Sequence, residues 1–286
     1  MNSLVIPPIF FLLLRNFIVL FRSFDYLLVM LGFFIKKSFF DGWDNFLQLI
    51  LQNLVYLGLL LGGMSLMYLT VENNLLFVSV GIVFLLLVSI SLGGTAESAK
   101  SWSDYSGDTW QPYVKGLKRN LKHSLFFFFL LSLIILCVAV TIPFYASFEN
   151  IIGWILPIIM VWLLVFLALA LPYYFPLMTL LPGDGPVKTL KKCFLVSFDN
   201  PGKSLFLLLH MLFDAVISIL TIGLLPGVSG IMLSQADMAK LLMMKYDWLE
   251  ENPDKTKKDV NWDELLYEER ENVGHRTLKG MIFPWK

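Results

Sequence analysis

Two ionisable residues, His210 and Asp214, lie inside an otherwise apolar stretch and are the first candidates for chemistry. Their i, i+4 spacing puts both side chains on one face of a helix. An imidazole and a carboxylate that share a face inside a membrane could pass a proton or line a solute path. The pair could equally be a helix-packing contact, in which Asp214 bonds to His210 or to a neighbouring hydroxyl.

The usual catalytic and cofactor motifs are absent from the sequence. It contains no glycine-rich phosphate loop and no HExxH, GxSxG or CxxC pattern. The three histidines are His123, His210 and His275. We therefore expect no enzyme activity, no metal site and no cofactor.

The composition is that of a membrane protein. Hydrophobic residues make up 57% of the chain and charged residues only 15%, whereas a soluble domain carries about a quarter charged residues. Much of the surface must therefore face lipid. The formal net charge of +0 gives no support for a nucleic-acid partner.

Five stretches are apolar over the roughly 20 residues that a helix needs to cross hydrocarbon. They are residues 46–69, 75–92, 124–145, 151–181 and 204–222. A weaker sixth stretch, residues 228–244, is broken by Asp237 and Lys240 and either crosses or re-enters the membrane. The predicted fold class is an all-α, polytopic transmembrane bundle with five to six spans and interfacial amphipathic helices on the cytoplasmic side.

The distribution of cations predicts the orientation. Lysine and arginine are concentrated in the connections 93–123 and 182–203, whereas the turns 70–74 and 146–150 contain neither. Cationic connections remain in the cytoplasm, so we expect both basic connections inside and both short turns outside. The tail, residues 246–286, is also assigned to the cytoplasm.

The N-terminal region, residues 1–37, contains an amphipathic pattern. On a helical wheel of residues 15–37, Arg15, Arg22, Asp25, Lys36 and Lys37 fall in one half, and bulky apolar residues fill the other. This pattern is typical of a helix that lies in the membrane interface. The alternative is a span in which Arg22 and Asp25 pair inside the bundle.

Two further segments combine a basic face with an apolar face. Lys115, Lys118, Arg119 and Lys122 recur at helical spacing, opposite Trp110, Val114, Leu117 and Leu121. Lys188, Lys191 and Lys192 repeat the basic pattern 73 residues later, with Ser197 at the position of Ser124. Such faces favour an anionic cytoplasmic leaflet. They could simply anchor the bundle, or they could dock the acidic surface of a partner.

Smaller patterns complete the prediction. The segment from Leu181 to Pro186 has turn composition, and Gly62, Gly63, Gly93 and Gly94 are expected to let helices approach closely. Trp262, Leu265, Leu266 and Glu269 predict a short amphipathic helix in the tail. The apolar end, residues 278–286, is expected to pack on the bundle, the interface or a partner.

The layout resembles the YesL-type family of bacterial membrane proteins, a domain-of-unknown-function family. The resemblance covers residues 38–245 and rests on Phe39-Phe-Asp-Gly-Trp-Asp-Asn45, on a basic helix entering the third span, and on Phe198-Asp-Asn-Pro-Gly202. It implies an accessory role beside a sugar importer, with a permease as partner, in the bacterial cytoplasmic membrane. The alternative is a small-solute transporter or channel that uses Gln48, Gln52, Asn53, His210 and Asp214.

Overall fold

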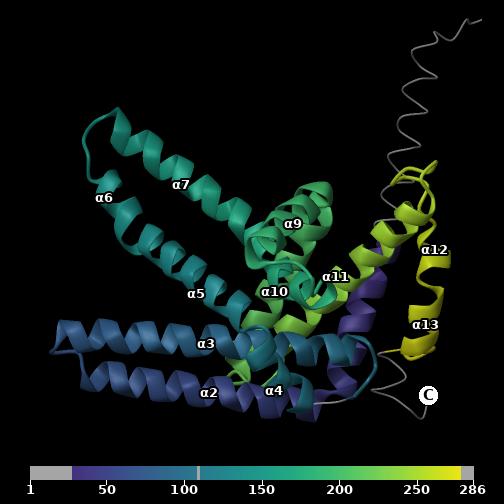
Figure 1. The fold of residues 1–286 in the computed structure, drawn as a ribbon, viewed down its shortest axis with the longest axis horizontal. Coiled ribbons are helices and arrows are strands. Elements are labelled where there is room, and N and C mark those ends of the chain that lie inside the picture. The colour runs from purple at the N-terminus through teal and green to yellow at the C-terminus, as the bar shows by residue number, and fades with distance from the viewer. Residues whose placement is uncertain (1–27, 108–109, 278–286) are drawn as a thin grey trace, which may run out of the picture. The chain divides into compact units, whose positions relative to one another are not determined.

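The computed structural model describes residues 28–107 and 110–277, and every regular element among them is a helix. A helix over residues 28–44 comes first. It is followed by α2 (Phe46–Leu69), α3 (Asn74–Ser103), α4 (Trp110–Arg119), α5 (Leu121–Leu136), a π-helical segment (Cys137–Thr141), α6 (Ile142–Ala146), α7 (Ile151–Ala170), a 3₁₀ turn (Leu171–Tyr173), α8 (Tyr174–Leu180), α9 (Pro186–Asp199), α10 (Pro201–Leu220), α11 (Gly227–Glu251), α12 (Trp262–Leu265) and α13 (Tyr267–Val273) (Figure 1). The predicted all-α class is confirmed.

Five helices of the described part are long and apolar enough to cross a membrane. They are Phe46–Leu69, Asn74–Ser103, Leu121–Ala146, Ile151–Leu180 and Pro201–Leu220. In the third and fourth, only 6% of the most apolar window is buried inside the chain. Apolar surfaces of that extent require an apolar surrounding. The chain is therefore a multi-pass integral membrane protein.

The sixth predicted segment, residues 228–244, is helical but is not among the five candidate spans. It lies within α11, where Asp237, Met238 and Ala239 are fully buried. A helix that carries a carboxylate in its interior needs protein rather than lipid around that side chain. The structure therefore makes α11 a helix covered by protein, and its crossing or re-entry of the membrane stays a prediction.

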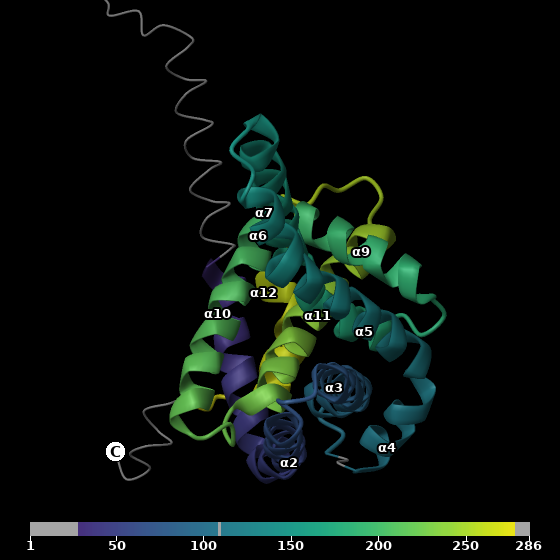
Figure 2. The same cartoon turned by 90° about the vertical axis from the view of Figure 1, so that its left-hand side faces the viewer.

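All five candidate spans belong to one compact unit, Asp41–Lys240. Within it, α2 and α3 form a hairpin whose turn is at residues 70–73, and α5–α6 form a second hairpin with α7 through residues 147–150. Figures 1 and 2 show α2 and α3 side by side, whereas in the second hairpin α7 packs on α6, next to the turn. The hairpins meet where α3 packs on α5 and α8, and their turns lie apart (Figure 1).

Helix α3 continues to Ser103, past the predicted end of the second span at residue 92. Its added turns are buried and rich in small residues, and α4 packs on them. A Cβ on Gly116 of α4 would lie 2.9 Å from the Gly93 carbonyl oxygen and 3.0 Å from the Gly94 Cα. The two backbones touch there, as predicted for this glycine pair. Gly62, by contrast, has no neighbour within 4 Å of its Cβ position.

Three pairs of consecutive helices are each joined by one buried asparagine. Asn45 separates the helix over residues 28–44 from α2, Asn120 separates α4 from α5, and Asn200 separates α9 from α10. The hydrogen-bond ladder continues through each break. At the second, the Asn120 amide donates to the Gly116 carbonyl and the Ser124 amide donates to the Asn120 carbonyl, both at 2.9 Å. Each of these spans is thus entered through a bend rather than a loop.

These bends correct the register of the predicted repeat. The shift of 73 residues pairs Ser124 with Ser197, but Ser124 follows its bend whereas Ser197 precedes its own. A shift of 80 residues superposes Asn120 on Asn200 and Ser124 on Ser204, and both serines are buried. The lysines are adjacent to the bend in one copy and two turns away in the other, so aligning lysines misplaces the helices.

The second compact unit is described over residues 28–40 and 241–277. Its short helices α12 and α13 bury a stripe at helical spacing, as predicted for this part of the tail. The stripe consists of Trp262, Leu266, Glu269 and Val273. The Lys37 ammonium, itself fully buried, lies 3.0 Å from the Glu269 carboxylate. A buried charge pair therefore ties the first described helix to α13.

This ion pair changes the prediction for the N-terminal region. Lys36 donates a 2.8 Å hydrogen bond to the Gly274 carbonyl, and Lys37 is paired with Glu269. The lysine end of the predicted interfacial face therefore binds the tail rather than lipid headgroups. Arg15, Arg22, Asp25 and the closing segment 278–286 lie outside the described residues.

Candidate functional site

The structure brings His210 and Asp214 together on α10. His210 Nδ1 lies 3.1 Å from Asp214 Oδ2, and the Ser234 hydroxyl of α11 donates to the same oxygen at 3.1 Å. Both α10 side chains are largely covered, with 16% and 10% of their side-chain surface exposed. The carboxylate is therefore held between an imidazole on its own helix and a hydroxyl on the next. This geometry agrees with the alternative in which His210 and Asp214 form a helix-packing contact.

Asn53 of α2 is the most heavily bonded polar side chain of the first span. Its amide nitrogen donates to the Leu224 and Pro226 carbonyls at 2.9 and 2.7 Å. Its oxygen accepts from the Ser229 backbone amide and hydroxyl at 3.0 and 2.8 Å. Gly227 lies against this side chain, and a Cβ there would overlap it. Asn53 thus fixes α2 to the turn that starts α11.

Helices α2 and α3 are joined by two further side-chain bonds. The Gln52 amide donates to the Ser98 hydroxyl at 2.6 Å, and the Tyr56 hydroxyl lies 2.7 Å from the Thr95 hydroxyl. Side-chain hydrogen bonds between the helices of membrane proteins each contribute about 0.6 kcal/mol on average. They hold α2 and α3 together at the base of the first hairpin, which is the end away from its turn.

These polar groups are divided among different helix contacts. Gln52 bonds to α3, Asn53 to the start of α11, and His210 and Asp214 lie at the contact between α10 and α11. Gln48, the remaining polar candidate of the first span, is half-buried. No three His, Cys, Asp or Glu side chains within residues 28–107 and 110–277 come close enough to hold a metal ion.

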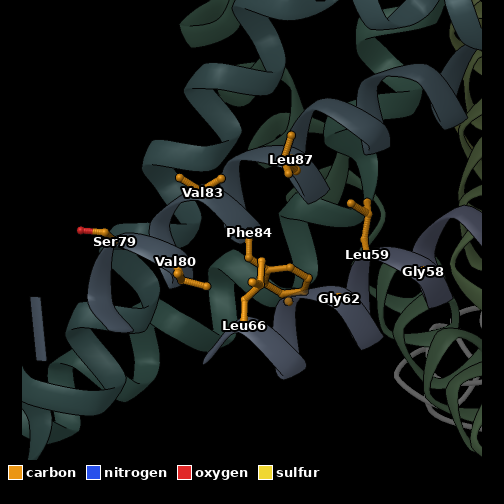
Figure 3. Close-up of a pocket in the computed structure, with 10 residues that line it drawn as sticks. Gly58, Leu59, Gly62, Leu66, Ser79, Val80, Val83, Phe84 and Leu87 are labelled. Atoms are coloured by element: carbon orange, nitrogen blue, oxygen red, sulfur yellow. The ribbon is translucent and has the colours of Figure 1, made fainter. Parts of the chain in front are cut away.

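A groove of about 360 Å³ lies between α2 and α3 in the outer part of the first hairpin (Figure 3). Gly58 and Gly62 leave its floor open, and Leu66, Val83 and Phe84 contribute walls. Ser79 is the sole hydroxyl residue in the lining, and its hydroxyl donates to the Leu75 carbonyl. The groove therefore offers apolar contact and no catalytic group.

Helix α4 presents three different faces. Tyr113 and Gly116, with Asn120 directly after the helix, are buried against α3. The predicted apolar face packs only in part. The Leu117 side chain reaches α3, where a Cβ on Gly94 would lie 3.0 Å from Leu117 Cδ2. Trp110, Val114 and Leu121, the last being the first residue of α5, are 43%, 50% and 41% exposed. The cations are exposed on the remaining side, as expected for Lys115, Lys118, Arg119 and Lys122.

Helix α9 carries its cations differently. Asp184, in the segment predicted to be only a turn, lies 2.7 Å from the Lys188 ammonium and 2.5 Å from that of Lys192. These two lysines hold the pKa of the Asp184 carboxyl below its ordinary value. Lys191 is exposed. On the packing face, burial raises the pKa of the Cys193 thiol to about 12, so it is not a nucleophile at neutral pH.

Two independent features place α4 at a membrane boundary. The second span starts at Asn74, and about 20 residues of helix cross the hydrocarbon. That length ends near Gly94, where Gly116 of α4 crosses α3. The third span begins at Leu121, directly after α4 and its bend.

Helix α9 lies along the same boundary. The His123 ring, in the first turn of the third span, donates from Nε2 to the Asp184 carbonyl at 3.1 Å. The Ser197 hydroxyl donates to the Leu169 carbonyl, near the end of the fourth span, at 3.1 Å. The predicted lipid-contact lysines of α4 and α9 therefore lie near the ends of the candidate spans that are away from both hairpin turns.

Sequence reasoning missed several residues that build these surfaces. Gly116 and Asn120 seat α4 on α3, and the Asn120 amide donates to the Gly93 carbonyl at 2.9 Å. Asp184 pairs with two lysines, and Ser234 bonds to Asp214. The spacing of Asp184 and Lys188, at i, i+4, was the one available signal.

No protein-family model matches the chain, and no curated protein or solved structure does so either. The resemblance to the YesL-type family therefore depends on the layout and residues given above.

Proposed function

We propose that this multi-pass membrane protein is a non-catalytic accessory or scaffold component of a membrane transport system. The observation that supports this proposal is the distribution of its intramembrane polar groups, which bond across separate helix contacts rather than along one path. The exposed apolar sides of both hairpins provide surface for the helices of another membrane protein.

The resemblance to the YesL-type family directs the proposal toward sugar uptake, with a permease as partner. In this proposal the protein resides in the bacterial cytoplasmic membrane, with α4, α9 and the tail on the cytoplasmic side. The concentration of lysine at one end of the spans supports that orientation. Cysteines introduced singly at Asn73 and Phe148 should then react with an impermeant reagent from outside intact cells. Labelling only after lysis would reverse the orientation.

Co-purification tests the accessory role directly. The full chain, extracted from native membranes in mild detergent, should carry a permease or transport ATPase in stoichiometric amount. The matched control is a tagged, unrelated membrane protein of similar abundance. If the chain instead emerges alone and the pure protein moves solute into liposomes, the accessory role is wrong.

A transporter or channel is the second candidate, and the His210–Asp214 pair is the observation that favours it. If the pair lines a solute path, His210→Ala and Asp214→Asn should abolish flux while leaving the folded yield unchanged. If it is a packing contact, yield and any activity should fall together. Folded yield after size-exclusion chromatography and liposome flux distinguish the two outcomes.

A further inference from the structure

We infer that α4, together with the first turn of α5, is a binding surface for anionic phospholipid headgroups, and that α9 is not, because the Asp184 carboxylate already pairs with two of its lysines. This inference does not depend on the accessory role. It needs only that the chain is inserted in a membrane and that α4 and α9 lie at the same boundary.

The charge on α4 is available to a ligand. Lys115, Lys118 and Lys122 are exposed and pair with no carboxylate among the described residues. Arg119 lies 3.7 Å from Glu97 and remains 53% exposed at its side chain. Four cations thus share one surface with a single nearby acid.

The same surface, α4 and the first turn of α5, carries an apolar row at the same depth. Trp110, Val114 and Leu121 are exposed beside the cations rather than packed on α3. A helix that buries an apolar row among acyl chains places adjacent lysines at the level of the phosphates. The ligand is therefore a phosphate within a bilayer, because free phosphate would leave this apolar row in water.

Helix α9 shares the boundary position but not the charge. Its exposed apolar residues include Val187, Leu195 and Phe198, so it too can lie among lipids. However, the Asp184 carboxylate contacts both Lys188 and Lys192. An incoming phosphate would have to displace that carboxylate. Lys191 is left as the one exposed cation of the three that does not contact Asp184.

Lipid competition at two reporter positions tests the inference. A fluorophore is attached at Val114→Cys or at Leu195→Cys of a full-length chain that lacks its native cysteines. The protein is reconstituted in mixed phosphatidylcholine and phosphatidylglycerol vesicles in which one lipid or the other is brominated, because a brominated lipid quenches nearby fluorophores. We expect phosphatidylglycerol to be preferred at position 114 and little preference at position 195.

Charge variants then identify the cause. Replacing Lys115, Lys118 and Lys122 by glutamine should lower the preference at position 114 by at least about fivefold, the effect of one cation near an anionic surface. Replacing the same three by arginine should retain it. Asp184→Asn should raise the preference at position 195. Thermal stability in a neutral detergent should not change in the glutamine variant, because these side chains are exposed.

Three results would overturn the inference. The first is equal quenching by the two lipids at position 114 in the unmodified chain. The second is an undiminished preference after the glutamine replacements. The third is a preference at position 195 that equals the one at position 114 and does not respond to Asp184→Asn. None of these results bears on whether a permease co-purifies, so the accessory role is tested separately.

Discussion

The two hairpins of the larger unit are built from similar lengths of apolar helix but are held in different ways. In the α2–α3 hairpin, 28% and 11% of the most apolar windows are buried, and Gln52 and Tyr56 bond across the helix contact. In the hairpin of α5–α6 and α7, each window is 6% buried. Its described hydroxyls, such as Ser132 and Thr141, bond to carbonyls of their own helix.

The comparison shows which residues determine how the helices associate. Lipid solvates leucine and phenylalanine as well as protein does, so apolar surface alone gives helices in a membrane little reason to associate. Small residues and paired polar groups supply the association, and they are concentrated at the base of the first hairpin. The second hairpin is a pair of spans held mainly by its turn and its ends.

The largest expected difference concerns leucine truncation. Leu207 of α10 is fully buried, whereas Leu133 of α5 is 45% exposed. Leu207→Ala should reduce the free energy of unfolding by about 3 kcal/mol, because it opens a cavity. Leu133→Ala should change it by less than about 1 kcal/mol, because lipid fills the space. Reversible unfolding in mixed micelles measures both, and equal losses would mean that α5 is covered.

The next comparison concerns polar side chains. Asn53→Ala removes four hydrogen bonds that join α2 to the start of α11, so it should destabilise the protein by about 2 kcal/mol. Ser132→Ala removes one local bond and should lie within about 0.5 kcal/mol of the unmodified protein. A cost for Ser132→Ala as large as that for Asn53→Ala would contradict the division between the hairpins.

The smallest expected effect is the change in unfolding free energy when one of two glycines is replaced by alanine. Its sign should differ between the two positions. Gly116→Ala forces a Cβ against the α3 backbone and should cost about 1–2 kcal/mol, after the gain of about 1 kcal/mol in helix propensity. Gly62→Ala extends into open space and should be neutral or slightly stabilising. The same unfolding assay reports both. Stabilisation by Gly116→Ala would mean that α4 can move away from α3.

The sequence was sufficient for the features that depend on apolarity. Runs of leucine and phenylalanine predicted the five spans, and the exposed cations of α4 followed from their helical spacing. The extension of α3 was missed because Ser98 and Thr95, which seal it, are equally common in loops. The part that Gly116 and Asn120 play in packing α4 on α3 was missed for the same reason, since glycine and asparagine give no hydrophobic pattern.

The sequence could not predict which residues far apart along the chain would pair. Nothing near Lys37 along the chain indicates that it will be buried against Glu269, and Asp214 gives no sign of Ser234 as its partner. Local spacing did place His210 beside Asp214. It could not show that the pair lies against another helix, which is what favours packing over a solute path.

The asparagine bends have a consequence for how a chain can change direction where water is scarce. At the first and third bends, one carbonyl accepts from both the backbone amide and the side-chain amide of the same asparagine: Asp41 from Asn45, at 3.2 and 2.8 Å, and Val196 from Asn200, at 3.1 and 3.0 Å. A corner usually exposes peptide groups that only solvent can satisfy. At these corners the asparagine side chain supplies an additional donor. The backbone carbonyl is therefore hydrogen-bonded without water where the chain enters the bilayer.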